Sequence, residues 1–233
     1  MSAIESVGVH LARLLPSADA ATRLRLEHAA QVRSFRSRDL LHARGVQLFP
    51  FLLLDGHLMT RRVAETGQVR AALIAGPGYL GGVHSISEPD AEAMYELVAL
   101  SDGTWATWDP RFVRSVALKD PGLGVDLLDH SSDFTVVLNM RLDEQSFESA
   151  RQRMAAILVR YGKAIFDTPH PVAQRADLAA MIGTSRVMMY RALSELEAEG
   201  LVARERTGGI RVLDEERLAS LVTVAAPEGA PSL

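Results

Sequence analysis

The chain has 233 residues, a formal net charge of −4 and no cysteine. The lack of cysteine excludes disulfides, a thiolate nucleophile and cysteine-ligated zinc or iron–sulfur clusters. No apolar stretch approaches the roughly 20 residues of a membrane span, and the N-terminus lacks the basic start and cleavage site of a secretory signal. We therefore expect a cytoplasmic protein with no membrane partner, built from one large or two modest domains.

The first half of the chain changes character near residue 38. Residues 5–35 are predicted to be helical, because leucines recur there with polar residues between them. Residues 38–115 consist of short apolar runs separated by turn signals. Asp55-Gly56 and Asp102-Gly103 lie between such runs and are dipeptides typical of hairpins. This pattern predicts an antiparallel roll or barrel.

A long helix is predicted over residues 122–145. Its apolar stripe has helical spacing and consists of Leu127, Phe134, Leu138 and Leu142. From the pattern alone, such a stripe is compatible with core packing or with a seam between two helices. A further helix follows after Ser146, and its apolar face comprises Met154, Ile157, Leu158 and Tyr161.

Two short helices with a tight turn are predicted between residues 172 and 199. Leu178 and Ile182 lie four residues apart on the first helix, which ends at Gly183. Thr184 and Ser185 are good N-caps for the second helix. Only a few residues separate the helices, as in a helix-turn-helix.

The second of these helices has two distinct faces when its side chains are placed at about 100° per residue. One face is predicted to be core and contains Met189, Ala192, Leu193 and Leu196. The opposite face contains Arg186, Val187, Tyr190, Arg191 and Ser194. Arginine binds guanine bidentately and a small apolar group packs on a thymine methyl, and the N-terminal residues of a recognition helix reach base edges. Three glutamates, at 195, 197 and 199, lie in the last turns of the helix, away from its arginine-bearing end.

A β-hairpin, or wing, is predicted after Gly200, with its turn around Thr207-Gly208-Gly209. Its arginines (Arg204, Arg206 and Arg211) are placed to approach a phosphate backbone. Residues 167–211 contain six arginines and six acids, so charge counting alone leaves another interpretation open. In that interpretation the helix pair is an ordinary amphipathic unit with a solvated charged face.

The stretch "ADLAAMIGTSRVMMYRALSELEAEGLV" (176–202), followed by a glycine-centred wing, resembles the C-terminal domain of the cyclic-AMP receptor protein/FNR (CRP/FNR) family of bacterial transcription regulators. Upstream, "DLLHARG" (39–45), "LFPFLLLDGHL" (48–58) and "GPGYLGG" (76–82) resemble the opening strands and glycine-rich turn of that family's β-roll. The resemblance covers nearly the whole chain and is most specific in the last third.

The resemblance implies an α+β fold with an N-terminal antiparallel β-roll, a long dimerisation helix and a C-terminal winged helix-turn-helix. The roll is of the cyclic-nucleotide-binding-like type, a double-stranded β-helix or jelly roll. The expected parts are a sensor-like domain (1–121), the dimerisation helix (122–145), a DNA-binding domain (146–224) and a tail (225–233).

A homodimer on a palindromic operator is also implied, with RNA polymerase as a further partner. The dimer seam would be Leu127, Phe134, Leu138 and Leu142. The residues expected to contact bases in double-stranded DNA are Arg186, Val187, Tyr190 and Arg191. The residues expected to contact phosphates are Gln174, Arg175, Thr184, Ser185, Arg204 and Arg206. The family commonly has glutamate at the position of Val187, so the preferred operator should differ at that step, because a carboxylate accepts from cytosine N4 and valine does not.

The chain departs from the cyclic-nucleotide-binding members of the family. Tyr79 follows Gly78 where those members have glutamate, and residues 84–97 contain four acids and no arginine to bind a cyclic phosphate. We therefore expect neither cyclic AMP nor cyclic GMP as effector, and the oxygen-sensing branch needs cysteines. The effector is unknown or absent. Tyr79, His84 and Asn139 are candidate pocket residues, although Asn139 is equally interpreted as a buried polar group that sets helix register.

Three alternatives remain. The first is a member of the same family gated by haem, with His84 as ligand, or by another small molecule. The second is a metal-dependent β-roll enzyme, but the seven histidines are scattered with no H-x-H or H-x-x-x-H pair, so we expect no enzyme, no metal and no bound cofactor. The third is an interaction module whose winged helix no longer binds DNA.

Overall fold

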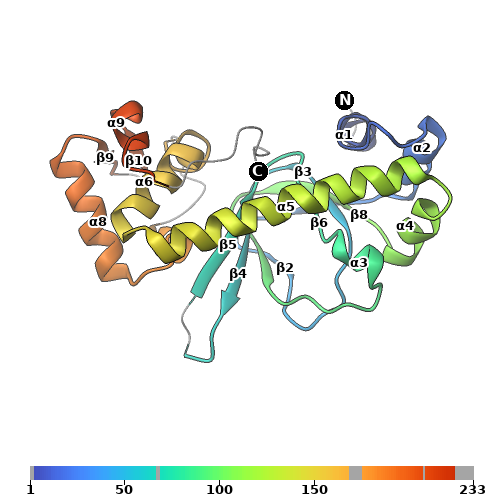
Figure 1. Ribbon diagram of the computed structural model, residues 1–233, viewed down its shortest axis with the longest axis horizontal. Coiled ribbons are helices and arrows are strands. Elements are labelled where there is room, and N and C mark those ends of the chain that lie inside the picture. Colours follow the sequence, from blue (N-terminus) through green and yellow to red (C-terminus); the bar gives the residue numbers. More distant parts are fainter. Residues whose placement is uncertain (1–2, 67–68, 168–174, 207, 224–233) are drawn as a thin grey trace. The chain divides into compact units, whose positions relative to one another are not determined.

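The computed structural model describes residues 3–66, 69–167, 175–206 and 208–223 (Figure 1). Its helices are α1 (Ala3–Leu14), α2 (Ala20–Ala29), α3 (His84–Ser87), α4 (Pro110–Ala117), α5 (Pro121–Phe147), α6 (Ala150–Tyr161), a π-helical turn η1 (Gly162–Phe166), α7 (Arg175–Met181), α8 (Arg186–Ala198) and α9 (Glu215–Ala219). Its strands are β1 (Gln31–Phe35), β2 (Leu40–His42), β3 (Phe51–Asp55), β4 (Leu58–Val63), β5 (Val69–Ala75), β6 (Leu80–Gly81), β7 (Glu96–Ala99), β8 (Gly103–Thr107), β9 (Val202–Arg204) and β10 (Ile210–Val212).

Strands β1 to β8 form two four-stranded sheets, in the orders β1-β8-β3-β6 and β2-β7-β4-β5. The first sheet is antiparallel: β8 pairs with β1 from Gln31↔Thr107 to Phe35↔Gly103 and with β3 from Phe51↔Thr107 onward. The predicted roll is therefore confirmed, and the chain has the α+β architecture of β-roll, long helix and C-terminal helix-turn-helix.

Strand β3 separates two sets of apolar side chains, because successive residues of a strand point to opposite faces. Leu52 and Leu54 belong to a core cluster that includes residues of α1, α2, α4 and the start of α5. On the other face, Phe51 is close to Trp105, with ring centroids 5.5 Å apart, and to Tyr79 at 6.0 Å. Phe49 adds a further ring, 5.6 Å from that of Trp105. The face of β3 opposite the helices is thus packed with aromatic rings.

The two Asp-Gly dipeptides do not form hairpins, contrary to the sequence prediction. Asp55-Gly56 joins β3 to β4, and Asp102-Gly103 joins β7 to β8, but each pair of strands is divided between the two sheets. The turns lie against each other: a Cβ on Gly56, whose φ is +88°, would be only 2.6 Å from the carbonyl oxygen of Asp102. These glycines allow the chain to cross from one sheet to the other, which a local turn signal does not distinguish from a hairpin.

Helix α5 confirms the predicted long helix and extends it by one residue at the start and two at the end. Two buried aspartates fix its first turns. Asp120 accepts hydrogen bonds from the backbone N–H groups of Gly122 (2.9 Å) and Asp19 (2.9 Å). Asp126 accepts from the backbone N–H groups of Ser17 and Ala18, at 3.1 and 2.9 Å. The carboxylates thereby tie the α1–α2 connection to the beginning of α5.

The chain divides into two compact units. Among the described residues, one unit comprises those up to Thr60 and Ile74–Val136, and the other comprises Arg61–Leu73 and those from Val137 to Thr223. The second unit contains the end of α5, helices α6 to α9 and the β9–β10 hairpin. No helix within the described ranges is both long enough and apolar enough to span a lipid bilayer.

Candidate nucleic-acid interface

Helices α7 and α8 and the turn between them form the predicted helix-turn-helix. Leu178 and Ile182, which lie four residues apart, are 0% and 1% exposed. Gly183 has a φ of +65°, which an L side chain rarely adopts, so glycine suits this turn. Ser185 caps α8, because its hydroxyl oxygen accepts from the backbone N–H of Met188 at 3.3 Å.

Two arginines that the sequence analysis missed bind the backbone of this turn. The Nε of Arg153, on α6, donates to the carbonyl of Ile182 at 2.7 Å. The Nη1 of Arg70, on β5, donates to the carbonyl of Gly183 at 2.8 Å. They lie 29 and 113 residues from their acceptors in the sequence, so no local sequence pattern predicts these hydrogen bonds. They satisfy carbonyls that follow a helix end, and hold the turn that positions α8.

Helix α8 has the two faces predicted for it. Its buried face consists of Met189, Ala192, Leu193 and Leu196, each at most 2% exposed. Its solvent face consists of Arg186, Val187, Tyr190, Arg191 and Ser194, all exposed. Val187 is 77% exposed and Tyr190 42%. The first turns of α8 therefore present hydrogen-bond donors, from Arg186 and Tyr190, beside the exposed apolar side chain of Val187.

The charges on α8 are less separated than the sequence analysis expected. Arg191 forms an i,i+4 ion pair with Glu195, its Nε lying 3.1 Å from the carboxylate. Both side chains are well exposed, so the pair contributes little stability. No described acidic side chain forms an ion pair with Arg186. Of the two arginines on this face, Arg191 is therefore paired with a carboxylate, and Arg186 has no such partner among the described residues.

Strands β9 and β10 pair antiparallel from Val202↔Val212 to Arg204↔Ile210 and confirm the predicted wing. Its arginines differ in their surroundings. Arg204 donates to Glu197 on α8, through Nε at 2.8 Å and also through Nη2, and this bonding raises the pKa of Arg204. Arg211 pairs with Glu205 at 2.9 Å. Arg206 is exposed near the tip. Two of the three predicted backbone-binding arginines are thus held by acids of the same domain.

Two further residues expected at phosphates, Thr184 and Ser185, lie in the turn before α8. Thr184 is half-buried, its N–H bonded to the carbonyl of Ala179 at 3.1 Å, and Ser185 is exposed. Arg175 is the first residue of α7, but its side chain lies outside the described residues. Gln174 also lies outside them.

The exposed apolar stripe of α5 is offset from the predicted seam. Leu138 and Leu142 are 40% and 64% exposed, as a seam requires, whereas Phe134 is half-buried. Leu127 is also half-buried and packs on the core cluster of the first unit. The neighbouring residue Leu128 is 66% exposed instead. The exposed stripe, with spacings of three and four, is Leu128, Ser131, Thr135, Leu138 and Leu142.

Two of the three candidate effector residues, Tyr79 and His84, line different cavities of the first unit. Tyr79 lines a cavity of about 380 Å³ together with Gly78 and His130. His84 is exposed and lines another cavity, of about 400 Å³. Asn139, on α5, is exposed in the single chain. Burial raises the pKa of Tyr79 and lowers that of His84, where Glu88 opposes the effect.

The described residues contain no group of three or more histidines and carboxylates placed to hold a metal ion. Around His84, the cavity is lined mainly by apolar side chains and by Arg114.

Comparisons with known proteins agree with this geometry. Residues 152–221 match the family of the Crp-like helix-turn-helix domain. No curated protein matches the chain. FixK2 from Bradyrhizobium japonicum has a similar structure, with a TM-score of 0.73 and 16% identity over 84% of this chain and 99% of that protein.

Two further solved structures are similar. The c-di-GMP-responsive global regulator CLP from Xanthomonas campestris has a TM-score of 0.66 and 16% identity, over 83% of this chain and 99% of that one. A CRP-family transcriptional regulator from Thermus thermophilus has a TM-score of 0.67 and 16% identity, over 86% of this chain and all of that one. At such identity these likenesses establish the fold, and the domain match covers α7, α8, the wing and α9.

Proposed function

We propose that this chain, a CRP/FNR-type transcription regulator with a Crp-like helix-turn-helix domain at residues 152–221, binds a palindromic operator as a homodimer. In this proposal α8 enters the major groove of each half-site, and Arg186, Val187, Tyr190 and Arg191 contact base edges. Arg206 and the turn residues Thr184 and Ser185 contact phosphates. Arg204 also contacts a phosphate, after its ion pair with Glu197 breaks.

The exposed N-terminal half of α8 carries the proposal. Its four candidate base-contacting residues are open to solvent while the opposite face is buried. Arg186 suits bidentate binding to guanine, and Val187 suits contact with a thymine methyl. Phosphate contacts from the wing would position the helix without reading sequence.

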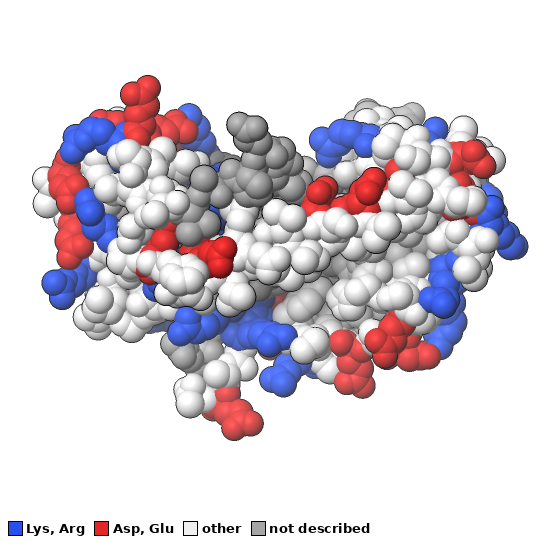
Figure 2. All heavy atoms as spheres, in the orientation of Figure 1, with Lys and Arg blue, Asp and Glu red and all other residues white. Residues whose placement is uncertain are grey.

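The stripe on α5 supports the homodimer. Three exposed leucines and two hydroxyl residues repeat at the three- and four-residue spacing of a coiled-coil seam. The hydroxyls of Ser131 and Thr135 already donate to the carbonyls four residues earlier, each at 2.9 Å, so burying them against a partner helix leaves no donor unsatisfied. Figure 2 shows a largely uncharged surface along α5, with acidic side chains beside it. A second α5 is the partner that fits.

The aromatic packing beside β3 supports the proposal that cyclic AMP and cyclic GMP are not effectors. Tyr79 is 9% exposed and its ring contacts Phe51. Its neutral phenol stands where cyclic-nucleotide-binding relatives have a carboxylate for the ribose. We expect no thermal stabilisation by either nucleotide, and an increase in melting temperature that saturates with concentration would overturn this part of the proposal.

Contact with RNA polymerase and location in the cytoplasm also belong to the proposal. Both follow from the role of an operator-binding transcription regulator, and neither bears on how α8 binds DNA.

Selection of duplexes from a random pool tests the proposal. The wild-type protein should enrich an inverted repeat whose half-sites are about one helical turn apart. Arg186→Ala should relax the preference at one base pair in each half-site, with a loss of about 1–3 kcal/mol per contact. Arg217→Ala is the matched control, because it also removes one exposed arginine, but from α9. Absence of any enriched repeat would instead support an interaction module.

A further inference from the structure

Two buried glutamates lie at the corner where α5 ends and α6 begins. Glu144 is 2% exposed and Glu148 5%. Ser149, between the helices, caps α6 in a capping box with Gln152. Carboxylates are expensive to remove from water, and they stay ionised there only when cations or N–H donors surround them. The hydrogen-bond and ion-pair partners of the two glutamates therefore show which elements are connected at this corner.

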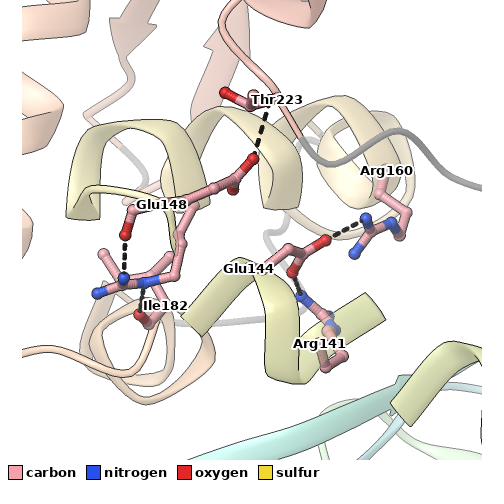
Figure 3. Close-up of polar contacts among 7 residues, drawn as sticks. Arg141, Glu144, Glu148, Arg160, Ile182 and Thr223 are labelled. Carbon is pink, nitrogen blue, oxygen red and sulfur yellow. Dashed lines mark hydrogen bonds and ion pairs between the residues drawn. The ribbon is translucent and has the colours of Figure 1, made fainter. Parts of the chain in front are cut away.

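Glu144 bridges the two helices (Figure 3). One carboxylate oxygen accepts from Arg141 of α5 at 2.9 Å, and the other accepts from Arg160 of α6 at 2.6 Å. Both guanidinium groups also lie over the ring of Tyr161, about 6 Å from its centroid. Burial raises the pKa of Glu144, but the two arginines outweigh this effect and hold the pKa below its usual value. The carboxylate is thus charged and fixed from both sides.

Glu148 continues the connection to the helix-turn-helix. Its carboxylate accepts from the backbone N–H of Thr223 at 2.9 Å. Its backbone carbonyl accepts from Arg153, the residue whose Nε binds the carbonyl of Ile182. Figure 3 shows these contacts running from the end of α5 to the turn before α8. The corner and the recognition turn are therefore joined by directional polar bonds as well as apolar packing.

We infer that Glu144 is a positioning residue that fixes the angle between α5 and the DNA-binding domain, and so sets the spacing between operator half-sites. This inference rests on the proposed function. In a symmetric dimer joined through α5, rotation of each domain at the α5–α6 corner changes the separation of the two α8 helices. One base pair corresponds to only about 3.4 Å along the duplex. Apolar contacts tolerate sliding, whereas a two-sided ion pair has one favoured geometry.

The test selects operators from pools that hold the half-site constant and vary the spacer by single base pairs. The wild type should favour one spacer length. In Glu144→Gln, the preference for that spacer over its neighbours should fall by about tenfold, equivalent to about 1.4 kcal/mol. Glu215→Gln is the control, because it makes the same change in an exposed ion pair with Lys163 and should keep the wild-type spacing. Arg160→Lys keeps a cation but loses the planar guanidinium group. It should reduce the preference for the wild-type spacer, but by less than Glu144→Gln does.

Binding to an isolated half-site should stay within about twofold of wild type in Glu144→Gln, since α8 itself is unchanged. An unchanged spacer preference in both Glu144→Gln and Arg160→Lys overturns the inference while leaving the proposed function intact. No operator for the wild type overturns the proposed function itself.

A second measurement tests the positioning role of Glu144 without DNA. Because the chain has no cysteine, Ala198→Cys on the exposed side of α8 gives one spin-label site per subunit. The distance distribution between the two labels of a dimer should be narrow and should broaden with Glu144→Gln. An equally narrow distribution in the variant counts against the positioning role.

Discussion

The ion pair between Glu197 and Arg204 restrains a predicted phosphate contact. Glu197 on α8 accepts from the backbone N–H of Arg204 at 3.2 Å and from its Nε at 2.8 Å. The two side chains are about one-third exposed, so the pair is worth about 0.2–1 kcal/mol. Arg204 must give up this pair, wholly or in part, before its guanidinium reaches a DNA phosphate.

Glu197→Gln should therefore tighten DNA binding. Relief of that penalty in two subunits amounts to about 0.4–2 kcal/mol, or a factor of about 2 to 30 in affinity. If one further phosphate per subunit is neutralised, the plot of log K against log salt steepens by about 1.8. The gain should be equal for operator and random duplexes, because phosphates carry no base identity.

Fluorescence anisotropy titrations at several salt concentrations measure both quantities, with Glu215→Gln as a control for charge alone. Unchanged affinity and slope in Glu197→Gln would refute the reasoning, because Arg204 would then remain away from the duplex even when released. A gain confined to one operator would point to base contact in place of phosphate contact.

Three other outcomes are expected. Arg206→Ala should weaken all duplexes alike and flatten the salt dependence by about 0.9 per subunit, measured in the same titrations; a sequence-selective loss would contradict the wing assignment. Leu142→Glu should convert the dimer to monomer in sedimentation velocity, because a charge would be buried at the seam, and a persistent dimer would place the interface elsewhere. The folded-state pKa of Glu144 is lowered, so its contribution to stability is present above its unfolded value of about 4.3 and is lost as pH falls through the folded pKa. The difference in urea unfolding free energy between wild type and Glu144→Gln should thus shrink in that acidic range, and a constant difference would show that the charge is irrelevant.

Features that depend on helical periodicity or on local cap and turn residues could be predicted from the sequence. The two faces of α8 follow from a 3.6-residue period, and Ser185 and Gly183 mark the start of α8 and the turn before it. The wing follows from its central glycines. These are local properties, and the chain encodes them within about ten residues.

Properties set by distant contacts could not be predicted. Leu127 and Leu128 both fit a helical stripe, and which of them is exposed depends on the core cluster that packs against Leu127. The carbonyl of Gly183 is bound by Arg70, 113 residues away, and Glu144 by Arg160, 16 residues away. Local pattern also places Glu197 among the solvated acids of α8, while the fold pairs it with an arginine of the wing.

Replacement of Val187 by glutamate tests most directly whether α8 reads base edges. A carboxylate accepts a hydrogen bond from cytosine N4, whereas valine does not. Val187→Glu lies at an exposed site, so it should fold normally and select an operator that differs from the wild-type operator at one symmetric base pair, with cytosine favoured there. If the variant selects the wild-type operator at every position, residue 187 does not face the bases and α8 is not the recognition helix.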